Sequence, residues 1–165
     1  FMKNIVLIGM PACGKSTIGY RLSPKINYPF IDVDKYLEEK ESRIISDIFV
    51  KEGEEHFREL ETKYLKEVSK RQGVIISTGG GAVKKKENID ILKKNGIIIF
   101  LNRAIENILE ENHENRPLLQ NIENLWKLYD ERIKLYRKYA DIIIKNDDDM
   151  NVIVERIITV LKGKL

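Results

Sequence analysis

The sequence predicts an α/β fold in which helices cover both faces of a parallel sheet. Five short runs of apolar or β-branched residues have the length of buried strands, namely Ile5–Ile8, Phe30–Val33, Val74–Ser77, Ile97–Leu101 and Ile142–Ile144. Helical patterns lie between these runs, and this alternation indicates a parallel sheet. Right-handed crossovers bring the carboxyl ends of such strands to one edge, so we expect the ligands to bind there.

The composition fits one domain covering residues 1–165. Of the 165 residues, 42% are hydrophobic and 33% are charged, so the chain can bury a substantial core. Acidic and basic residues are interleaved and the net charge is only +3, which does not indicate a nucleic-acid-binding surface. Cys13 is the single cysteine, so no internal disulfide can form. We find no signal peptide, no membrane span and no leftover apolar stripe, and therefore expect a cytoplasmic monomer.

A phosphate-binding loop follows the first strand run. Gly9–Thr17 reads GMPACGKST and matches the pattern G-x-x-x-x-G-K-[ST]. The glycines let successive backbone N–H groups converge on a polyphosphate, while Lys15 adds a positive charge and Ser16 a magnesium ligand. A chance turn between a strand and a helix is the alternative, and the strand–loop–helix context disfavours it. On its own, the loop predicts that a polyphosphate binds here with Mg²⁺. If the polyphosphate belongs to a nucleotide, the expected contacts are Ala12, Cys13, Gly14, Lys15, Ser16 and Thr17.

The first helix begins near Lys15, and Ser23-Pro24 should end or kink it.

Two carboxylates, Asp32 and Asp34, stand at the end of the second strand run. Taken alone, Asp34 would be explained as the N-cap of a helix that begins at Lys35. Beside a phosphate loop, the pair suggests instead a magnesium site and a group that positions an attacking hydroxyl.

The next segment places an arginine on an amphipathic helix. Gly53 should end one helix, and Glu54–Val68 should form another whose core positions have helical spacing, namely Phe57, Leu60, Tyr64, Leu65 and Val68. Arg58 lies near the start of this helix, where the helix dipole disfavours a cation, and this placement suggests a functional role for the arginine. A solvated arginine on the surface is the alternative. The third strand run leads into Gly79-Gly80-Gly81. Three glycines in a row suggest that the backbone approaches a ligand or another segment closely.

A polar run without apolar periodicity, 110–115, ends in Arg116-Pro117-Leu118-Leu119. This pattern is typical of a lid, at about residues 110–120, that brings a positive charge to a transferring phosphoryl group. An ordinary surface connection is the alternative.

Helices should follow at Ile122–Tyr139, with Arg132 and Tyr136 one turn apart, and at Met150–Leu161. His56 and His113 lack partners at ligand spacing, so a transition-metal site is not expected.

Taken together, these segments resemble the shikimate kinase family, which belongs to the nucleoside-monophosphate-kinase-like branch of P-loop proteins. Six pieces agree in order, namely Gly9–Thr17, Asp32 with Asp34, Phe57-Arg58, Gly79–Gly81, Arg116–Leu119, and Arg132 with Tyr136. The phosphate loop alone occurs in many nucleotide-binding proteins. The combination with the other five pieces is highly specific, and the match covers nearly the whole chain.

The resemblance implies a three-layer α/β/α fold of the P-loop kinase type, with a five-stranded parallel sheet in the order 2-3-1-4-5. It also implies a substrate-binding region at about residues 34–61. The implied reaction, a step of aromatic amino acid biosynthesis, transfers the γ-phosphoryl group of ATP to the 3-hydroxyl of shikimate, giving shikimate 3-phosphate and ADP.

The resemblance assigns roles to single residues as well. It implies that Lys15, Asp34 and Arg116 are catalytic, with Lys15 on the β- and γ-phosphates, Asp34 as candidate base on the ring hydroxyls, and Arg116 on the nucleotide and the transferred charge. Ser16 would bind magnesium, with Asp32 acting through water. Arg58 and Arg132 would pair with the shikimate carboxylate, which suits bidentate guanidinium binding, and Gly79, Gly80 and Gly81 would complete the substrate site.

The sequence departs from the family pattern at three places. Ala12-Cys13 stands where a glycine and a small residue are common, and Lys134 stands where proline is frequent. Leu109-Glu110-Glu111 replaces an arginine that stacks on adenine in many members, which leaves Asn146–Asp149 as the expected adenine loop. Two other functions stay open at this point. One is a kinase of the same fold for another small hydroxy acid, such as gluconate, and the other is a slow ATPase that acts as a switch or interaction module.

Overall fold

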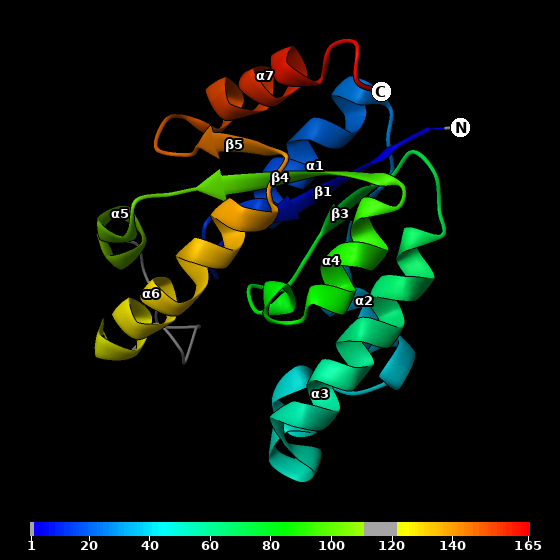
Figure 1. Ribbon diagram of the computed structural model, residues 1–165, viewed down its shortest axis with the longest axis vertical. Coiled ribbons are helices and arrows are strands. Elements are labelled where there is room, and N and C mark those ends of the chain that lie inside the picture. The colour runs from blue at the N-terminus through cyan, green and yellow to red at the C-terminus, as the bar shows by residue number, and fades with distance from the viewer. Residues whose placement is uncertain (1, 111–121) are drawn as a thin grey trace.

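The computed structural model describes residues 2–110 and 122–165 and contains the predicted parallel sheet (Figure 1). Its strands are β1 (Asn4–Ile8), β2 (Phe30–Asp32), β3 (Ile75–Ser77), β4 (Gly96–Asn102) and β5 (Ile142–Lys145). They lie in the order β2-β3-β1-β4-β5, which confirms the predicted fold class and strand order. Ile5 of β1 pairs with Ile75 on one side and Ile97 on the other. All five residues of β1 are buried, which explains why the central strand has no polar alternation.

Helices cover the sheet on both faces. They are α1 (Lys15–Ile26), α2 (Val33–Glu41), α3 (Ile45–Ser69), α4 (Lys86–Lys93), α5 (Ile105–Glu110), α6 (Ile122–Tyr139) and α7 (Met150–Leu161), with a short 3₁₀ turn, η1 (Ala82–Lys84). In Figure 1, α1 and α7 lie together above the sheet, while α4 and α6 lie below it. The three layers meet at one core made mostly of aliphatic strand residues.

Ser23-Pro24 does not end the first helix, so that part of the prediction was wrong: α1 continues through Pro24 to Ile26. Pro24 lies in the last turn, where the missing N–H removes a single helical hydrogen bond. The helix then ends at Asn27, whose backbone is left-handed at φ 57°. Just beyond it, the N–H of Tyr28 donates to the carbonyl of Ser23, and the Ser23 hydroxyl donates to the carbonyl of Tyr28. These bonds stabilise the end of the helix without the proline donor.

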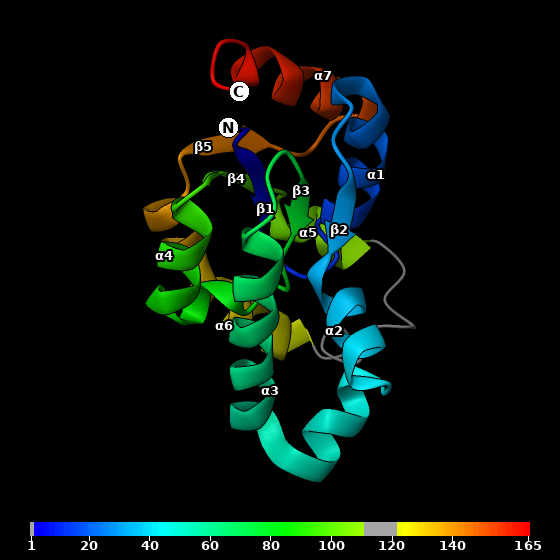
Figure 2. The same ribbon diagram turned by 90° about the vertical axis from the view of Figure 1, so that its right-hand side faces the viewer.

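Helices α2 and α3 project from the sheet as an arm (Figure 2). As predicted, Gly53 separates two helical segments, because its φ of 85° and ψ of 169° interrupt α3. The arm has a small core of its own, formed by Leu37, Ile48, Phe57, Leu60 and Tyr64. Hydrogen bonds tie α2 to α3, since the Tyr36 hydroxyl contacts Glu67 and the Tyr64 hydroxyl contacts Glu41. The arm therefore holds side chains of α2 and α3 in fixed relation to one another.

The expected lid lies mostly outside the described residues, and so does Arg116. Within the described part of the chain, no helix has both the length and the apolar character needed to cross a membrane.

The acidic run Asp147–Asp149 stabilises the start of α7 and the segment around α5. Asp147 accepts hydrogen bonds from the N–H of Ala104 and the amide of Asn107, and Asp149 caps α7.

Candidate active site

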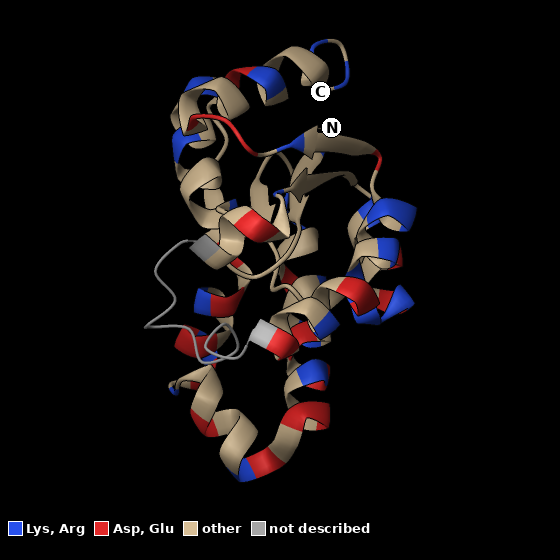
Figure 3. Ribbon diagram, turned by 90° about the vertical axis from the view of Figure 1, so that its left-hand side faces the viewer, with Lys and Arg blue, Asp and Glu red and all other residues tan. Residues whose placement is uncertain are grey.

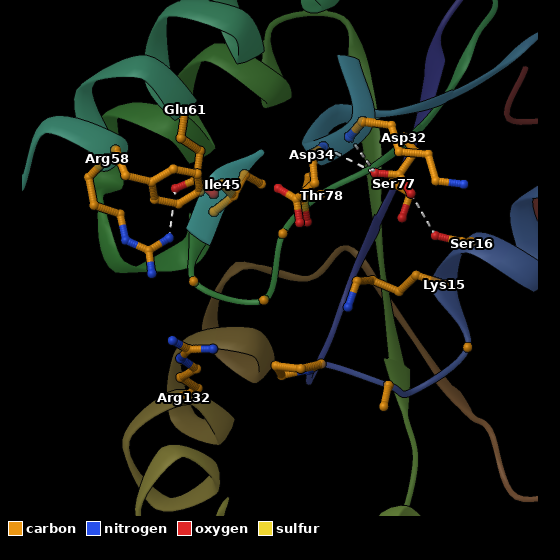
Figure 4. A pocket seen from close by; sticks show the side chains of 18 of the residues that line it. Lys15, Ser16, Asp32, Asp34, Ile45, Arg58, Glu61, Ser77, Thr78 and Arg132 are labelled. Atoms are coloured by element: carbon orange, nitrogen blue, oxygen red, sulfur yellow. Dashed lines mark hydrogen bonds and ion pairs between the residues drawn. The ribbon is translucent and has the colours of Figure 1, made fainter. Parts of the chain in front are cut away.

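A cleft of about 460 Å³ opens at the carboxyl edge of the sheet (Figure 4). It is surrounded by the phosphate loop, the start of α2, both segments of α3, the glycine loop and α6. Most of the residues singled out from the sequence line this one cleft, namely Ala12, Gly14, Lys15, Ser16, Thr17, Asp32, Asp34, Arg58, Gly79, Gly80, Gly81 and Arg132. The structure thus brings together side chains from segments more than 100 residues apart in the sequence.

The phosphate loop wraps around the side chain of Lys15. The ammonium group donates to the carbonyl of Gly9 at 2.8 Å and to that of Met10 at 2.9 Å. Gly14 has a φ of 96° and stands at the N-cap of α1, so the positive end of that helix faces the cleft. Residue 12 also has a left-handed backbone, with a φ of 63° for Ala12. This geometry leaves the rim of the loop suited to an anion.

Cys13 takes a different place from its neighbours in the loop. Its side chain is 1% exposed and does not line the cleft. Its carbonyl accepts a hydrogen bond from the amide of Asn146, which comes directly after β5. Asn146 thereby connects the expected adenine loop to the phosphate loop.

Asp32 anchors the start of α2. One carboxylate oxygen, Oδ1, accepts from the N–H groups of Asp34 and Lys35, and the other, Oδ2, accepts from the Ser16 hydroxyl at 2.9 Å. The strand therefore ends at Asp32, one residue before the predicted Val33, and α2 begins at Val33 rather than at Lys35. The reason is that Asp32, not Asp34, is the N-cap. This leaves the side chain of Asp34 directed into the cleft (Figure 4).

Asp34 is the carboxylate whose acidity the fold changes most clearly. Burial, followed by the negative charges of Glu61 and Asp32, raises the pKa of Asp34 from 3.8 to about 6, and Lys15 opposes this shift. Among the described residues, Oδ1 of Asp34 has no hydrogen-bond partner. A carboxylate with a pKa close to neutrality is suited to accept a proton from a bound hydroxyl.

Each of the three glycines makes room for a functional side chain. A Cβ on Gly79 would lie 2.9 Å from Oδ1 of Asp34. A Cβ on Gly80 would lie 2.8 Å from Cδ of Pro11 and 3.1 Å from Nη1 of Arg132. A Cβ on Gly81 would overlap the guanidinium of Arg58. The close approach predicted from the glycine run is therefore an approach to the protein's own side chains.

Arg58 and Arg132 lie at the same end of the cleft, Arg58 on α3 and Arg132 on α6 (Figure 4). Arg58, on α3, pairs with Glu61 at 2.9 Å and packs on the ring of Phe57. Arg132, on α6, is 5% exposed. One turn later, the Tyr136 hydroxyl donates to the carbonyl of Gly80 at 2.6 Å, and its ring stacks on Phe100. This anchor fixes α6 against the glycine loop.

Glu61 is a cleft residue that the sequence reasoning missed. It is 1% exposed, and burial raises the pKa of its carboxyl, while Arg58, Arg132 and Lys85 oppose the shift. The sequence did contain a signal that Glu61 is buried, because position 61 lies one turn after the core residue Phe57 on the buried stripe of α3. A charged residue on such a stripe needs a partner of opposite charge, which here is Arg58. The apolar wall of the cleft, Ile45, Phe49 and Phe57, was also not assigned to the site.

Comparison with known proteins shows where this arrangement belongs. A sequence model of the family described as shikimate kinase matches residues 11–162. The chain belongs to the shikimate kinase family. The shikimate kinase of Clostridium beijerinckii is 47% identical, over 99% of this chain and 98% of that protein. The shikimate kinase of Aquifex aeolicus is 39% identical, over 97% of this chain and 96% of that protein.

Solved structures of shikimate kinases superpose along almost the entire chain. The enzyme from Acinetobacter baumannii, in complex with shikimate, has a TM-score of 0.92 and 33% identity, covering 99% of this chain and 94% of that one. A gluconokinase from Sinorhizobium meliloti has a TM-score of 0.65 and 16% identity, covering 98% of this chain and 93% of that one. At that identity the gluconokinase shows a shared fold only. The chain is therefore an ATP-dependent kinase of the shikimate kinase family.

Proposed function

We propose that the chain transfers the γ-phosphoryl group of ATP to the 3-hydroxyl of shikimate, giving shikimate 3-phosphate and ADP. One observation carries this proposal, namely that two guanidinium groups, Arg58 and Arg132, line the same cleft as Asp34 and the phosphate loop. Shikimate has a single carboxylate and several hydroxyls, so it matches a site with paired cations on one side and a proton acceptor on the other. The similar Acinetobacter baumannii structure holds shikimate.

Arg58 and Arg132 would bind the carboxylate through their planar forks, and the backbone of Gly79, Gly80 and Gly81 would contact the ring. Asp34 would hold the ring hydroxyls and accept the proton of the 3-hydroxyl as the oxygen attacks the γ-phosphorus. Its pKa of about 6 allows the ionised form to dominate at neutral pH. Glu61 would hold the guanidinium of Arg58 in place.

Ser16 and Asp32 fit a magnesium ion, because their oxygens lie 2.9 Å apart beside the phosphate loop and Mg²⁺ prefers hard oxygen ligands. Ser16 would bind the ion directly and Asp32 through water. Bound there, Mg²⁺ would neutralise charge on the phosphates of ATP. Lys15 would contact the β- and γ-phosphates, and Arg116, from the segment outside the described residues, would stabilise the transferred charge.

We also propose that the chain is one domain that works as a cytoplasmic monomer without nucleic-acid partners. Figure 3 supports the last point, since Lys and Arg are mixed with Asp and Glu along the helices. A substrate-binding region close to the predicted residues 34–61 is supported by the separate core of the α2–α3 arm.

Two alternatives remain to be separated by experiment, a gluconate kinase and a slow ATPase module. A slow ATPase module would not need Arg58, Arg132 and a buried Glu61 in the cleft beside the phosphate loop. Gluconate also carries one carboxylate and several hydroxyls, so the choice between it and shikimate is made by the assay. A coupled ADP-release assay with shikimate, with gluconate and without acceptor tests all three. We expect rapid ADP release with shikimate alone. ATP turnover that does not depend on shikimate would refute the proposal.

A further inference from the structure

A buried chain of polar groups links α3 to the segment that follows the three glycines. The Thr62 hydroxyl on α3 lies 2.7 Å from Oδ1 of Asn88 on α4. The Asn88 amide, Nδ2, donates to the carbonyl of Ala82 at 2.9 Å. Asn88 is fully buried and Thr62 is 8% exposed. Neither side chain lines the cleft, so the roles assigned above do not use them.

The direction of each hydrogen bond in this chain is fixed. Asn88 must turn its NH₂ group toward the Ala82 carbonyl, because two carbonyl oxygens would repel one another. Its own oxygen then faces Thr62 and can only accept. The single hydroxyl proton of Thr62 has two acceptors within reach, the Asn88 oxygen at 2.7 Å and the Arg58 carbonyl at 3.1 Å, and the shorter contact takes it. A shift of α3 along its axis would therefore leave a buried polar group unpaired.

Both ends of this chain lie next to the expected carboxylate site. Thr62 follows Arg58 by one helical turn, and Ala82 follows Gly81 directly. Gly81 is also the residue on which the Arg58 guanidinium packs, with no room for a Cβ between them. In Figure 1, α4 runs alongside α3 and joins the glycine loop through η1. The polar chain thus spans the two backbone segments whose separation places the guanidinium.

We propose that Thr62 and Asn88 are positioning residues for shikimate binding, which they influence through the placement of Arg58 against the glycine loop. This inference rests on the proposed function. The phosphate loop and Asp34 contact neither residue, so loss of the chain should weaken the binding of shikimate and leave the binding of ATP unchanged.

The test is Thr62→Val, which keeps the shape of the side chain and removes the hydroxyl. We expect the KM for shikimate to rise roughly three- to tenfold, with the KM for ATP unchanged and kcat lowered less than about twofold. Thr62→Ser should restore the KM for shikimate. Asn88→Leu should act in the same direction as Thr62→Val. If Asn88→Leu does not fold, Thr62→Val and Thr62→Ser decide the question.

Asn4→Leu is the matched control. Asn4 is also a buried asparagine that bridges backbone groups, donating to the carbonyl of Arg71 at 2.8 Å and accepting from the N–H of Val74 at 3.1 Å. It stands at the opposite edge of the sheet, so Asn4→Leu should lower the melting temperature without changing the KM for shikimate.

If Thr62→Val lowers the melting temperature but leaves the KM for shikimate unchanged, as Asn4→Leu should, the two residues are merely structural and the inference is overturned. Equal rises in both KM values would overturn it as well. Absence of shikimate-dependent turnover in the unmodified protein is a separate outcome, because it refutes the proposed function itself.

Discussion

Arg58 and Glu61 lie one turn apart on α3 and form an ion pair at 2.9 Å inside the wall of the cleft. Oε2 of Glu61 would lie 3.1 Å from a Cβ on Gly79, and Oδ1 of Asp34 would lie 2.9 Å from the same point. Two carboxylates thus flank one glycine, and within residues 2–110 and 122–165 only Glu61 of the two is paired with an arginine. The charge of Glu61 acts on Asp34 as well as on Arg58.

Glu61→Gln should move the pH dependence of catalysis. After burial, the negative charge of Glu61 is the largest cause that raises the pKa of Asp34, so its removal lowers that pKa. The acidic limb of the kcat/KM profile for shikimate, expected near pH 6 in the unmodified protein, should shift to lower pH. Profiles between about pH 4.5 and pH 8 measure this, with the exposed Glu59→Gln as control. A limb that stays in place or moves to higher pH would show that Asp34 ionisation does not control the rate.

Arg58→Ala should mainly weaken the binding of shikimate. Charge-assisted hydrogen bonds contribute about 1.5–3 kcal/mol, so we expect the KM for shikimate to rise roughly 10- to 100-fold while the KM for ATP changes little. Steady-state kinetics with each substrate varied in turn measure both values. Arg21→Ala, on the exposed face of α1, is the control for loss of an arginine. An unchanged KM for shikimate in Arg58→Ala would contradict the role assigned to this residue.

Asp34→Asn should abolish most turnover, since the variant lacks a group that can accept the proton of the attacking hydroxyl. The expected loss in kcat is about 10²- to 10⁴-fold. The affinity for ATP, measured by calorimetry, should stay close to that of the unmodified protein. Unchanged turnover would remove Asp34 from the mechanism.

The same substitution should stabilise the ligand-free protein above pH 6. The folded state raises the pKa of Asp34 from 3.8 to about 6, so folding favours the neutral carboxyl. This lowers the free energy of unfolding as pH rises through that window, with no penalty below about pH 4 and a full penalty above pH 6, at most about 3 kcal/mol. Thermal melts at several pH values should show Asp34→Asn gaining on the unmodified protein only as pH rises. An equal difference at pH 4 and pH 7 would contradict the pKa assigned to Asp34.

Much of the fold could be predicted from the sequence because its signals are local. The phosphate loop and the buried strand runs have short-range patterns, and the bounds of α6 and α7 agree with their apolar periodicity. A proline near the end of a helical pattern can either end the helix or lie in its last turn, and the neighbouring residues do not distinguish the two. This explains the wrong prediction that α1 ends at Pro24. Asp32 and Asp34 could both be recognised, but the sequence alone did not show which one caps α2, because either carboxylate can take that role.

The residues of the cleft could not all be predicted from local patterns, because the cleft is formed by segments far apart in the sequence. Glu61 resembled one more polar residue on a helix until the fold placed Arg58 and the glycine loop around it. The same holds for Thr62 and Asn88, which are 26 positions apart and meet only in the packed structure. The roles given to the site residues stay predictions that the variants described here can test.

Gly53→Ala should destabilise the arm although the glycine has no neighbour within 4 Å of its would-be Cβ. Its φ of 85° and ψ of 169° fall in a region that only glycine adopts readily, so alanine should cost roughly 1–3 kcal/mol. Chemical denaturation measures the difference. Gly163→Ala is the control, since Gly163 also has a positive φ and open surroundings but lies beyond the end of α7 and joins no helical segments. Equal effects of the two substitutions would show that Gly53 is not needed to join the two segments of α3.

Identification of the product formed from ATP, Mg²⁺ and shikimate decides whether the cleft is a shikimate kinase active site. Phosphorus and proton magnetic resonance of the reaction mixture can locate the new phosphate ester. We expect one product, shikimate with its phosphate on the 3-hydroxyl, in amounts equal to the ADP released. Inorganic phosphate as the main product, or an ester at another hydroxyl, would contradict it.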